Sequence, residues 1–536
     1  MSQNQQSAQK RPGTLRSLGK ALTSWRTASV SLLSFASGMP LGLVWVAIPD
    51  WMRDIGVDIR IVGLFTLAQA PWTFKFLWSP VMDRYIPPFL GRRRGWAAIT
   101  QVALLILTLC LAGVGDHPQT PWVVAALALA IAFAGASQDI AIDAYAVDVL
   151  RPDEQAIAVG ARNGIWRGAY TLAGGLAITL AGSWGWPAVN AFLACLYLPM
   201  LLITWKAPEP ENVAAAPTSL KEAVWYPFLG FLSRHRALEI LAFVILYKLA
   251  DNLAQTLQRP FLIDMGYNEM DRGLALSTVA FFGSLIGTAV GGILTAPLGL
   301  GRSLWIFGFF QIFSNAGYAL LAMQDGVNRP LMLAAIGFET LSSGLGSGAF
   351  GVLLLRMTQK RFSATQYALF SSLFSIPRIL AGPICGFAVY SVGWETFFWA
   401  TIPLGIPGML MLWRFVPFTA REPEFHVEEV QVRRPLSLGE LVTRGLAGTA
   451  VGLAVAALTT ALLEALRTAK DNPGAPFDMG SPLLAILRPE DTGGWLTILG
   501  VVVCGVVCGL FTAAVSAARH GAGQDLAADA PEESEA

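Results

Sequence analysis

Two aspartates, Asp139 and Asp143, lie four residues apart within a long apolar run. In an α-helix this spacing places both carboxylates on one face. Two neighbouring carboxylates in a low-dielectric environment repel each other, so one of them holds a proton more readily, as proton-coupled transport requires. The alternative is that they pair with Lys75, Arg162 or Arg167 and only hold helices together. The sequence leaves both interpretations open.

Other ionisable residues within apolar runs are few, and each is a functional candidate because a charge inside a bilayer is costly. Lys248 and Asp251 are three residues apart, and we favour a pair that faces a cavity over a purely structural pair. Glu339 stands alone before a run of small residues, and function and packing are equally open for it. Arg378, next to Pro377, is a candidate for binding an anionic substrate. The predicted proton-coupling and substrate-cavity residues are Lys75, Gln138, Asp139, Asp143, Arg162, Lys248, Asp251, Glu339 and Arg378.

The composition indicates a membrane protein. Of 536 residues, 54% are hydrophobic and only 14% are charged, against about 25% charged in soluble domains. The net charge of +1 gives no field that would attract nucleic acid. The four histidines fall in predicted loops or the tail, and no cysteine has zinc-site spacing. We therefore predict no cofactor, no metal and no enzymatic activity.

Apolar runs of roughly 20 residues, the length that spans a bilayer core, predict an all-α protein with about fourteen transmembrane helices. The runs lie near 28–49, 61–81, 96–115, 122–148, 159–183, 186–205, 237–262, 273–296, 303–323, 330–357, 364–390, 394–416, 438–465 and 495–517. The implied organisation is a tail (1–27), a six-helix bundle (28–205), a linker (206–236), a second six-helix bundle (237–416), a linker (417–437), an extra helix pair (438–517) and an acidic tail (518–536).

Lysine and arginine gather in alternate loops, and such loops are cytoplasmic in membrane proteins. This asymmetry predicts that both termini are cytoplasmic and that the first span is not cleaved.

The loop after the second span contains Asp83 and Arg84, followed by Gly91 and a run of three arginines. This pattern resembles the loop signature of major facilitator proteins, in which acids and bases latch the cytoplasmic side; a basic loop that only reflects topology is the alternative. The predicted gate residues are Asp83, Arg84, Arg92, Arg93, Arg94, Asp148 and Arg151.

Several longer runs resemble a single branch of that superfamily, the AmpG family of muropeptide permeases. They are Phe35–Pro40, Phe74–Pro80, Ala136–Ile140, Leu246–Asp251 and Phe362–Gln366. They fall in both predicted bundles, and the extra helix pair also fits that family.

The resemblance implies a major facilitator fold in a bacterial inner membrane. It further implies proton-driven import of N-acetylglucosamine–anhydro-N-acetylmuramyl peptides for peptidoglycan recycling, with muropeptide, protons and lipid as partners and a monomer assumed. A major facilitator transporter of another large anionic solute, such as acetyl-CoA, is the first alternative. A membrane enzyme or sensor is the second.

Overall fold

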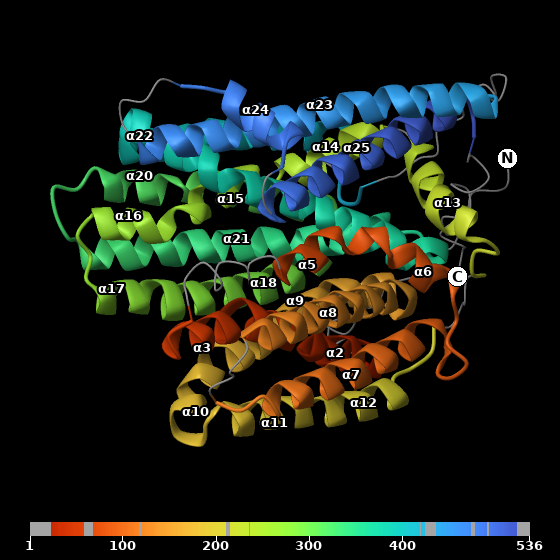
Figure 1. The fold of residues 1–536 in the computed structure, drawn as a ribbon, viewed down its shortest axis with the longest axis horizontal. Helices are drawn as coiled ribbons and strands as arrows, with labels where there is room; N and C mark the ends of the chain where they lie inside the picture. The colour runs from red at the N-terminus through yellow and green to blue at the C-terminus, as the bar shows by residue number, and fades with distance from the viewer. Residues whose placement is uncertain are drawn as a thin grey trace, which may run out of the picture.

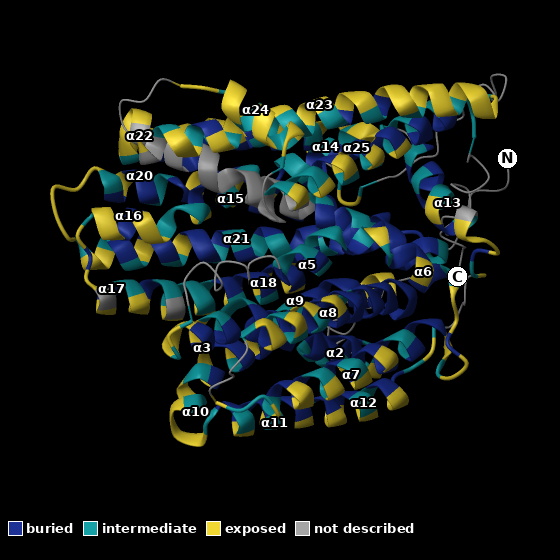
Figure 2. Ribbon diagram, viewed as in Figure 1, coloured by how far each residue is buried: buried dark blue, intermediate teal, exposed yellow. Residues whose placement is uncertain are grey.

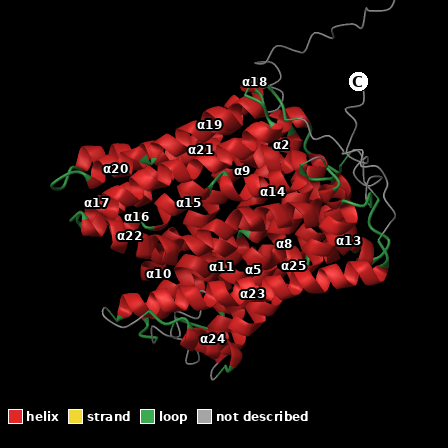
Figure 3. Ribbon diagram, turned by 90° about the horizontal axis from the view of Figure 1, so that it is seen from above, coloured by secondary structure: helices red, strands yellow, loops and turns green. Residues whose placement is uncertain are grey.

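A computed structural model describes residues 23–57, 68–116, 121–210, 215–234, 236–418, 420–423, 436–472, 477–489 and 492–522. Within these ranges the secondary structure is helical, with no β-strand (Figure 3). The predicted all-α class is confirmed.

Ten helices of the described chain are long and apolar enough to cross a bilayer. They are Trp25–Asp54, Gly91–Ala112, Pro121–Val149, Trp186–Lys206, Met270–Leu298, Leu300–Ala322, Arg329–Met357, Ser391–Arg414, Leu438–Ala469 and Thr497–Ala518. The predicted span at 237–262 is instead divided into short helices at Lys248 and Leu257, and residues 61–67, a third of the span at 61–81, lie outside the described residues. The number fourteen therefore stays a prediction.

The helices before the central linker are interrupted at several points, one of them at the polar residue Lys75. The elements are α2 (Trp25–Gly42), η1 (Leu43–Ala47), α3 (Ile48–Asp54), α5 (Ala70–Phe74), η3 (Lys75–Leu77), α6 (Ser79–Arg84), α7 (Gly91–Ala112), α8 (Pro121–Val149), α9 (Pro152–Thr171), η4 (Leu172–Leu176), α10 (Ala177–Trp184), α11 (Trp186–Cys195) and α12 (Tyr197–Lys206). Pro71 and Pro80 each lie in the first turn of a helix, where a missing N–H costs little.

The helices after the linker are also interrupted in the middle of the bundle. The elements are α14 (Ala237–Leu246), α15 (Leu249–Thr256), α16 (Gln258–Asp264), α17 (Glu269–Gly273), η5 (Leu274–Val279), α18 (Ala280–Leu298), α19 (Leu300–Ser314), α20 (Ala316–Ala322), α21 (Arg329–Met357), η6 (Lys360–Phe362) and α22 (Ser363–Phe415). Gly393, with φ of +77°, turns α22 sharply and divides it into two helices.

The two groups of helices meet along α8, α9, α18, α21 and α22 (Figure 1). Gly292 on α18 lies against the backbone of α9, and a Cβ at that position would overlap the carbonyl oxygen of Ala156. A small residue is needed there because the helix backbones approach closely.

Four further helices lie outside these two groups: α13 (Leu220–Leu232), α23 (Leu438–Asp471), α24 (Gly480–Leu487) and α25 (Thr492–Ala518). The helix α13 forms inside the predicted linker, is capped by Ser219, and packs on α6, α22 and α25. The long helices α23 and α25 pack together, and α23 carries many exposed residues (Figure 2). Leu446 and Val451 on α23 are each 64% exposed, as suits a helix that faces lipid.

Candidate functional site

The predicted acidic pair lies at the centre of a buried ionic cluster. The Lys75 ammonium donates to Asp139 and lies 3.4 Å from Asp143 Oδ2. The Arg162 guanidinium of α9 donates to Asp143 Oδ1. Since one lysine contacts both aspartates, their carboxylates share a face of α8 as the four-residue spacing predicts. We name Lys75, Asp139, Asp143 and Arg162 the N-cluster.

A break in the helix places the lysine of the N-cluster. Lys75 begins the short 3₁₀ segment η3 between α5 and α6. Its side chain is buried to all but 5%, and Asp143 and Arg162 are 8% and 11% exposed. Asp139, at 19%, is the most accessible member. Formally the four charges cancel, so every ion has a partner despite the burial.

Gln138 does not join the N-cluster. One residue along the helix from Asp139, it faces α7, where Thr100 donates to its side-chain oxygen. Tyr367 of α22, which was not among the predicted residues, is buried and interacts electrostatically with Lys75, Asp143 and Arg162.

Lys248 and Asp251 form a second buried pair on the other side of the bundle, with 3.0 Å between Nζ and Oδ2. Lys248 lies at the break between α14 and α15, and each side chain is only 3% exposed. The ammonium also donates to the carbonyl oxygen of Ser343 at 2.8 Å and to its hydroxyl at 3.3 Å. The structure brings the predicted pair together and ties it to α21.

Glu339, one turn before Ser343 on α21, is completely buried. Gln255 donates to one carboxylate oxygen at 2.7 Å, and the Tyr318 hydroxyl donates to the other at 3.1 Å. Both donors are neutral. We name Lys248, Asp251 and Glu339 the C-cluster. Arg378 belongs to α22, but its side chain lies outside the described residues.

Four of the predicted gate residues, Asp83, Arg92, Arg93 and Asp148, meet at the end of the bundle where α6 and α13 lie (Figure 1). Arg93 at the start of α7 donates to Asp83 and to Asp148, each at 2.7 Å. Asp83 also accepts bonds from the backbone of Ala364 and Thr365, at 3.2 and 2.8 Å, and from the Thr365 hydroxyl at 2.6 Å. These bonds join α6 to the first turn of α22, so they close this end between the two helix groups.

The remaining gate arginines have different surroundings. Arg92 donates to the carbonyl oxygens of Lys360 and Arg361, at 3.4 and 3.5 Å, and so also crosses between the groups. Arg94 contacts Ala207 and Glu209 in the linker instead. Arg84 lies over the ring of Tyr85. Arg151 precedes α9, and its backbone N–H donates to Glu154 at 3.2 Å.

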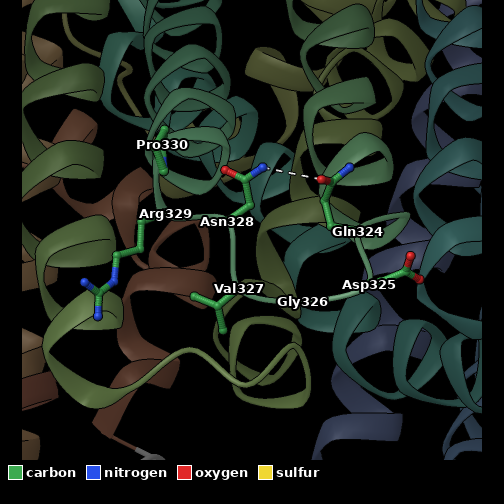
Figure 4. A pocket seen from close by; sticks show the side chains of 7 residues that line it. All are labelled: Gln324, Asp325, Gly326, Val327, Asn328, Arg329 and Pro330. Carbon is green, nitrogen blue, oxygen red and sulfur yellow. Dashed lines mark hydrogen bonds between the residues drawn. The ribbon is translucent and has the colours of Figure 1, made fainter.

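A surface hollow lies at the loop between α20 and α21, and none of its lining residues belongs to these clusters (Figure 4). Its Asp325 and Arg329 side chains point in opposite directions, and Arg329 pairs with Asp271 at 2.8 Å. Nothing in this loop assembles a set of convergent polar groups. Among the described residues, no group of three or more His, Cys, Asp or Glu side chains could hold a metal ion.

Sequence reasoning missed the neutral partners of the charged residues: Gln255, Tyr318, Ser343, Ser363, Thr365 and Tyr367. Spacing offered a signal for one of them, because Gln255 follows Asp251 by four residues and therefore shares its helix face.

Comparison with known proteins gives a family for most of the chain. Residues 30–382 match the model of the Major Facilitator Superfamily. The chain is 40% identical over 389 residues to the anhydromuropeptide permease of Escherichia coli (strain K12), covering 72% of this chain and 79% of the relative. It is 28% identical over 404 residues to the putative transporter AmpG 4 of Rickettsia felis, covering 73% and 97%. These relatives are named as permeases and transporters, not as enzymes.

Two solved structures share the fold at low sequence identity. The human organic anion transporter MFSD10 (TETRAN) has a TM-score of 0.53 and 13% identity, with 75% of this chain and all of that chain covered. A bacterial homologue of the iron transporter ferroportin, in an outward-facing state, has a TM-score of 0.51 and 15% identity, with 72% and 98% covered. At this identity the likeness concerns the fold alone.

Proposed function

The chain belongs to the Major Facilitator Superfamily and, within it, to the family of the anhydromuropeptide permeases, and from this membership we propose that it imports anhydromuropeptides by proton symport. The substrates are N-acetylglucosamine–anhydro-N-acetylmuramyl peptides, and the pathway served is peptidoglycan recycling. The membrane is the bacterial inner membrane. The lysines and arginines of alternate loops support a topology with both termini in the cytoplasm.

The N-cluster is the observation that carries the coupling mechanism. Its two cations are paired with two carboxylates. When a proton neutralises Asp139 or Asp143, the positive charge of Lys75 or Arg162 is left in excess in a low-dielectric site. A carboxylate of the substrate peptide then supplies the missing negative charge. Proton and anionic substrate thereby favour each other's binding, as a symporter requires.

The gate supplies the conformational part of the cycle. Alternating access in this fold is largely rocking of one helix bundle against the other around a central site. The bonds from Asp83 and Arg92 to α22 and its preceding turn hold the bundles, residues 28–205 and 237–416, together at the cytoplasmic end. This conformation therefore offers its binding site to the periplasmic side. Breaking the gate opens the site to the cytoplasm.

The test is uptake of labelled anhydromuropeptide into proteoliposomes that contain the purified full-length chain. We expect accumulation when the exterior is more acidic, and exchange of internal for external substrate without a gradient. Asp143→Asn should abolish gradient-driven accumulation, and unchanged uptake and pH dependence in that variant would refute the coupling role. Adding acetyl-CoA as a competitor tests the alternative substrate class. Acetyl-CoA should inhibit muropeptide uptake only if the chain transports solutes of that class.

A further inference from the structure

We propose that Glu339 is a second proton-binding site, separate from the aspartates of the N-cluster, and that it holds its proton in the conformation described above. This inference rests on the proposed function, since it assigns a further residue to the same proton-coupled cycle.

The first argument is the environment of the carboxyl group. Glu339 has no exposed surface, and its hydrogen-bond donors, Gln255 and Tyr318, are uncharged. A buried carboxylate without a cation pays a large desolvation cost, and such groups take up a proton instead. Asp139 and Asp143 avoid this cost because each contacts a cation.

The second argument is the charge around Glu339. Among the described residues, the charged or titratable groups that face it are Lys248 and Asp251 at the start of α15 and Tyr318 on α20. The ammonium of Lys248 is already engaged by Asp251 and by Ser343. Two other helices, α18 and α9, also pack against α21. Helix α18 contains no charged residue, and Arg162 of α9 is bound to Asp143. The C-cluster therefore holds two carboxyl groups and one cation, and one proton makes it neutral.

The third argument is that the hydrogen bonds suit a protonated acid. The 2.7 Å contact to Gln255 is a bond from amide N–H to carboxylate oxygen. When the amide turns over, its carbonyl oxygen accepts a bond from the carboxylic O–H across the same distance. Ser343, 3.1 Å from the Gln255 nitrogen, is a hydroxyl that donates or accepts in either arrangement. The site therefore accommodates both protonation states without moving a helix.

The fourth argument is position along the bundle. Helices α8 and α21 both end at the gate, where Asp148 and the turn after Met357 meet the arginines of α7. Counted from these ends, Asp139 lies ten residues back on α8 and Glu339 eighteen residues back on α21. The eight-residue difference places Glu339 about 12 Å farther from the closed gate at 1.5 Å per residue. Gln255, which donates to Glu339, is itself exposed. A proton that enters from the open side thus reaches Glu339 before it reaches the N-cluster.

The experiment compares wild type with Glu339→Gln, which fixes the neutral form, in the full-length chain. In proteoliposomes we expect gradient-driven accumulation to fall at least about tenfold, the factor of one pH unit, while exchange without a gradient persists. In infrared spectra of the purified protein at neutral pH, we expect wild type to have a carboxylic-acid C=O band that shifts in D₂O and that the variant lacks. Asp325→Asn, in the exposed loop between α20 and α21, is the matched control and should change neither measurement.

The outcomes separate the two proposals. If wild type shows no muropeptide exchange, the proposed function fails and this inference falls with it. If wild type transports but Glu339→Gln keeps full accumulation, or keeps the acid band, only the role of Glu339 is overturned. If Glu339→Gln does not fold, Tyr318→Phe decides the matter. It removes a donor to the charged form, so the pH dependence of uptake should move by about one unit to higher pH, and an unmoved profile overturns the proposal.

Discussion

The helices before the linker and those after it stabilise buried polar groups in the membrane with different kinds of partner. The helices before the linker use ions: the N-cluster pairs two carboxylates with two cations, and the gate joins Arg93 to two aspartates. The helices after the linker use mostly neutral hydrogen-bonding groups. Their buried Glu339 is held by an amide and a phenol, and their part of the gate consists of backbone N–H groups, backbone carbonyl oxygens and hydroxyls.

The difference indicates where charge can change during the cycle. In a matched ionic cluster, a single proton or a single lost charge unbalances all members, because the low dielectric amplifies each interaction. Neutral hydrogen bonds contribute about 1 kcal/mol each and can be exchanged one at a time. We therefore expect variants of ionic residues to have large and coupled effects, and variants of their neutral partners to have small and local ones.

Asp143→Asn should have the largest effect, because Asp143 is the one residue of the N-cluster that contacts both cations. Removing its charge leaves Lys75 and Arg162 with Asp139 alone. We expect gradient-driven uptake to fall about 100-fold or more and the free energy of unfolding to fall by about 3–5 kcal/mol, as for a broken buried ion pair. Uptake in proteoliposomes and thermal unfolding in detergent measure the two effects.

Asp139→Asn is the matched control for that variant. Asp139 has the same charge and helix face but contacts only Lys75 and is more accessible. The Asp139→Asn variant should therefore lower the free energy of unfolding less than Asp143→Asn does. Equal losses of stability in the two variants would contradict the central position of Asp143.

The pair Lys248–Asp251 should give the next largest effect, and a double variant sharpens the comparison. Asp251→Asn alone leaves a buried ammonium without its carboxylate and should cost about 3 kcal/mol. Lys248→Met combined with Asp251→Asn removes both charges and should restore most of that stability. We expect uptake to stay low in the double variant, because the C-cluster then lacks Lys248, which is its cation. Recovery of uptake together with stability would make the pair purely structural.

The sequence predicted which charged residues lie buried in polar clusters better than it predicted their partners. The four-residue spacing of Asp139 and Asp143 fixes a common face from helix geometry alone, and both do meet Lys75. Scarcity of charge within apolar runs was sufficient to select Lys248, Asp251 and Glu339. Gln138 was selected by adjacency to Asp139, but adjacent residues point about 100° apart on a helix, and its side chain faces α7.

Long-range partners could not be predicted because they depend on which helices touch. Thr365 lies 282 residues from Asp83 along the chain, and no sequence pattern marks Tyr318 as a partner of Glu339. The breaks at Lys75 and Lys248 are also tertiary features, since each occurs within an apolar run long enough to be one helix. The helix α13 formed in a stretch predicted as a linker because three prolines and mixed charges near it masked its apolar face.

Arg93→Gln should shift the gate by an intermediate amount. It removes the cation shared by Asp83 and Asp148, although Asp83 keeps its bonds from α22 and Asp148 keeps Arg92 at 3.8 Å. We expect the closed conformation to lose about 2 kcal/mol relative to the open one, a population change of roughly 30-fold. Spin labels at the exposed Ile86 and Phe418, in a chain without its native cysteines, measure opening of this end. An unchanged distance distribution would mean that the aspartates do not depend on Arg93.

Thr365→Val should have the smallest effect, and it tests the neutral side of the comparison most directly. The variant removes the hydroxyl that donates to Asp83 at 2.6 Å but keeps the backbone N–H that donates to the same oxygen at 2.8 Å. Since one hydroxyl donor to the carboxylate is lost and the carboxylate stays bonded to Arg93, the closed gate should weaken by about 1.5 kcal/mol, or roughly tenfold in population. Ser363→Ala, which removes the hydroxyl that accepts from Arg93 at 2.6 Å, is the matched variant and should behave alike in the same spin-label measurement. If either hydroxyl variant opened the gate as far as Arg93→Gln does, the neutral groups of α22 would hold the gate as strongly as the ions of α6 and α7, and the division of chemistry between the two sides would be wrong.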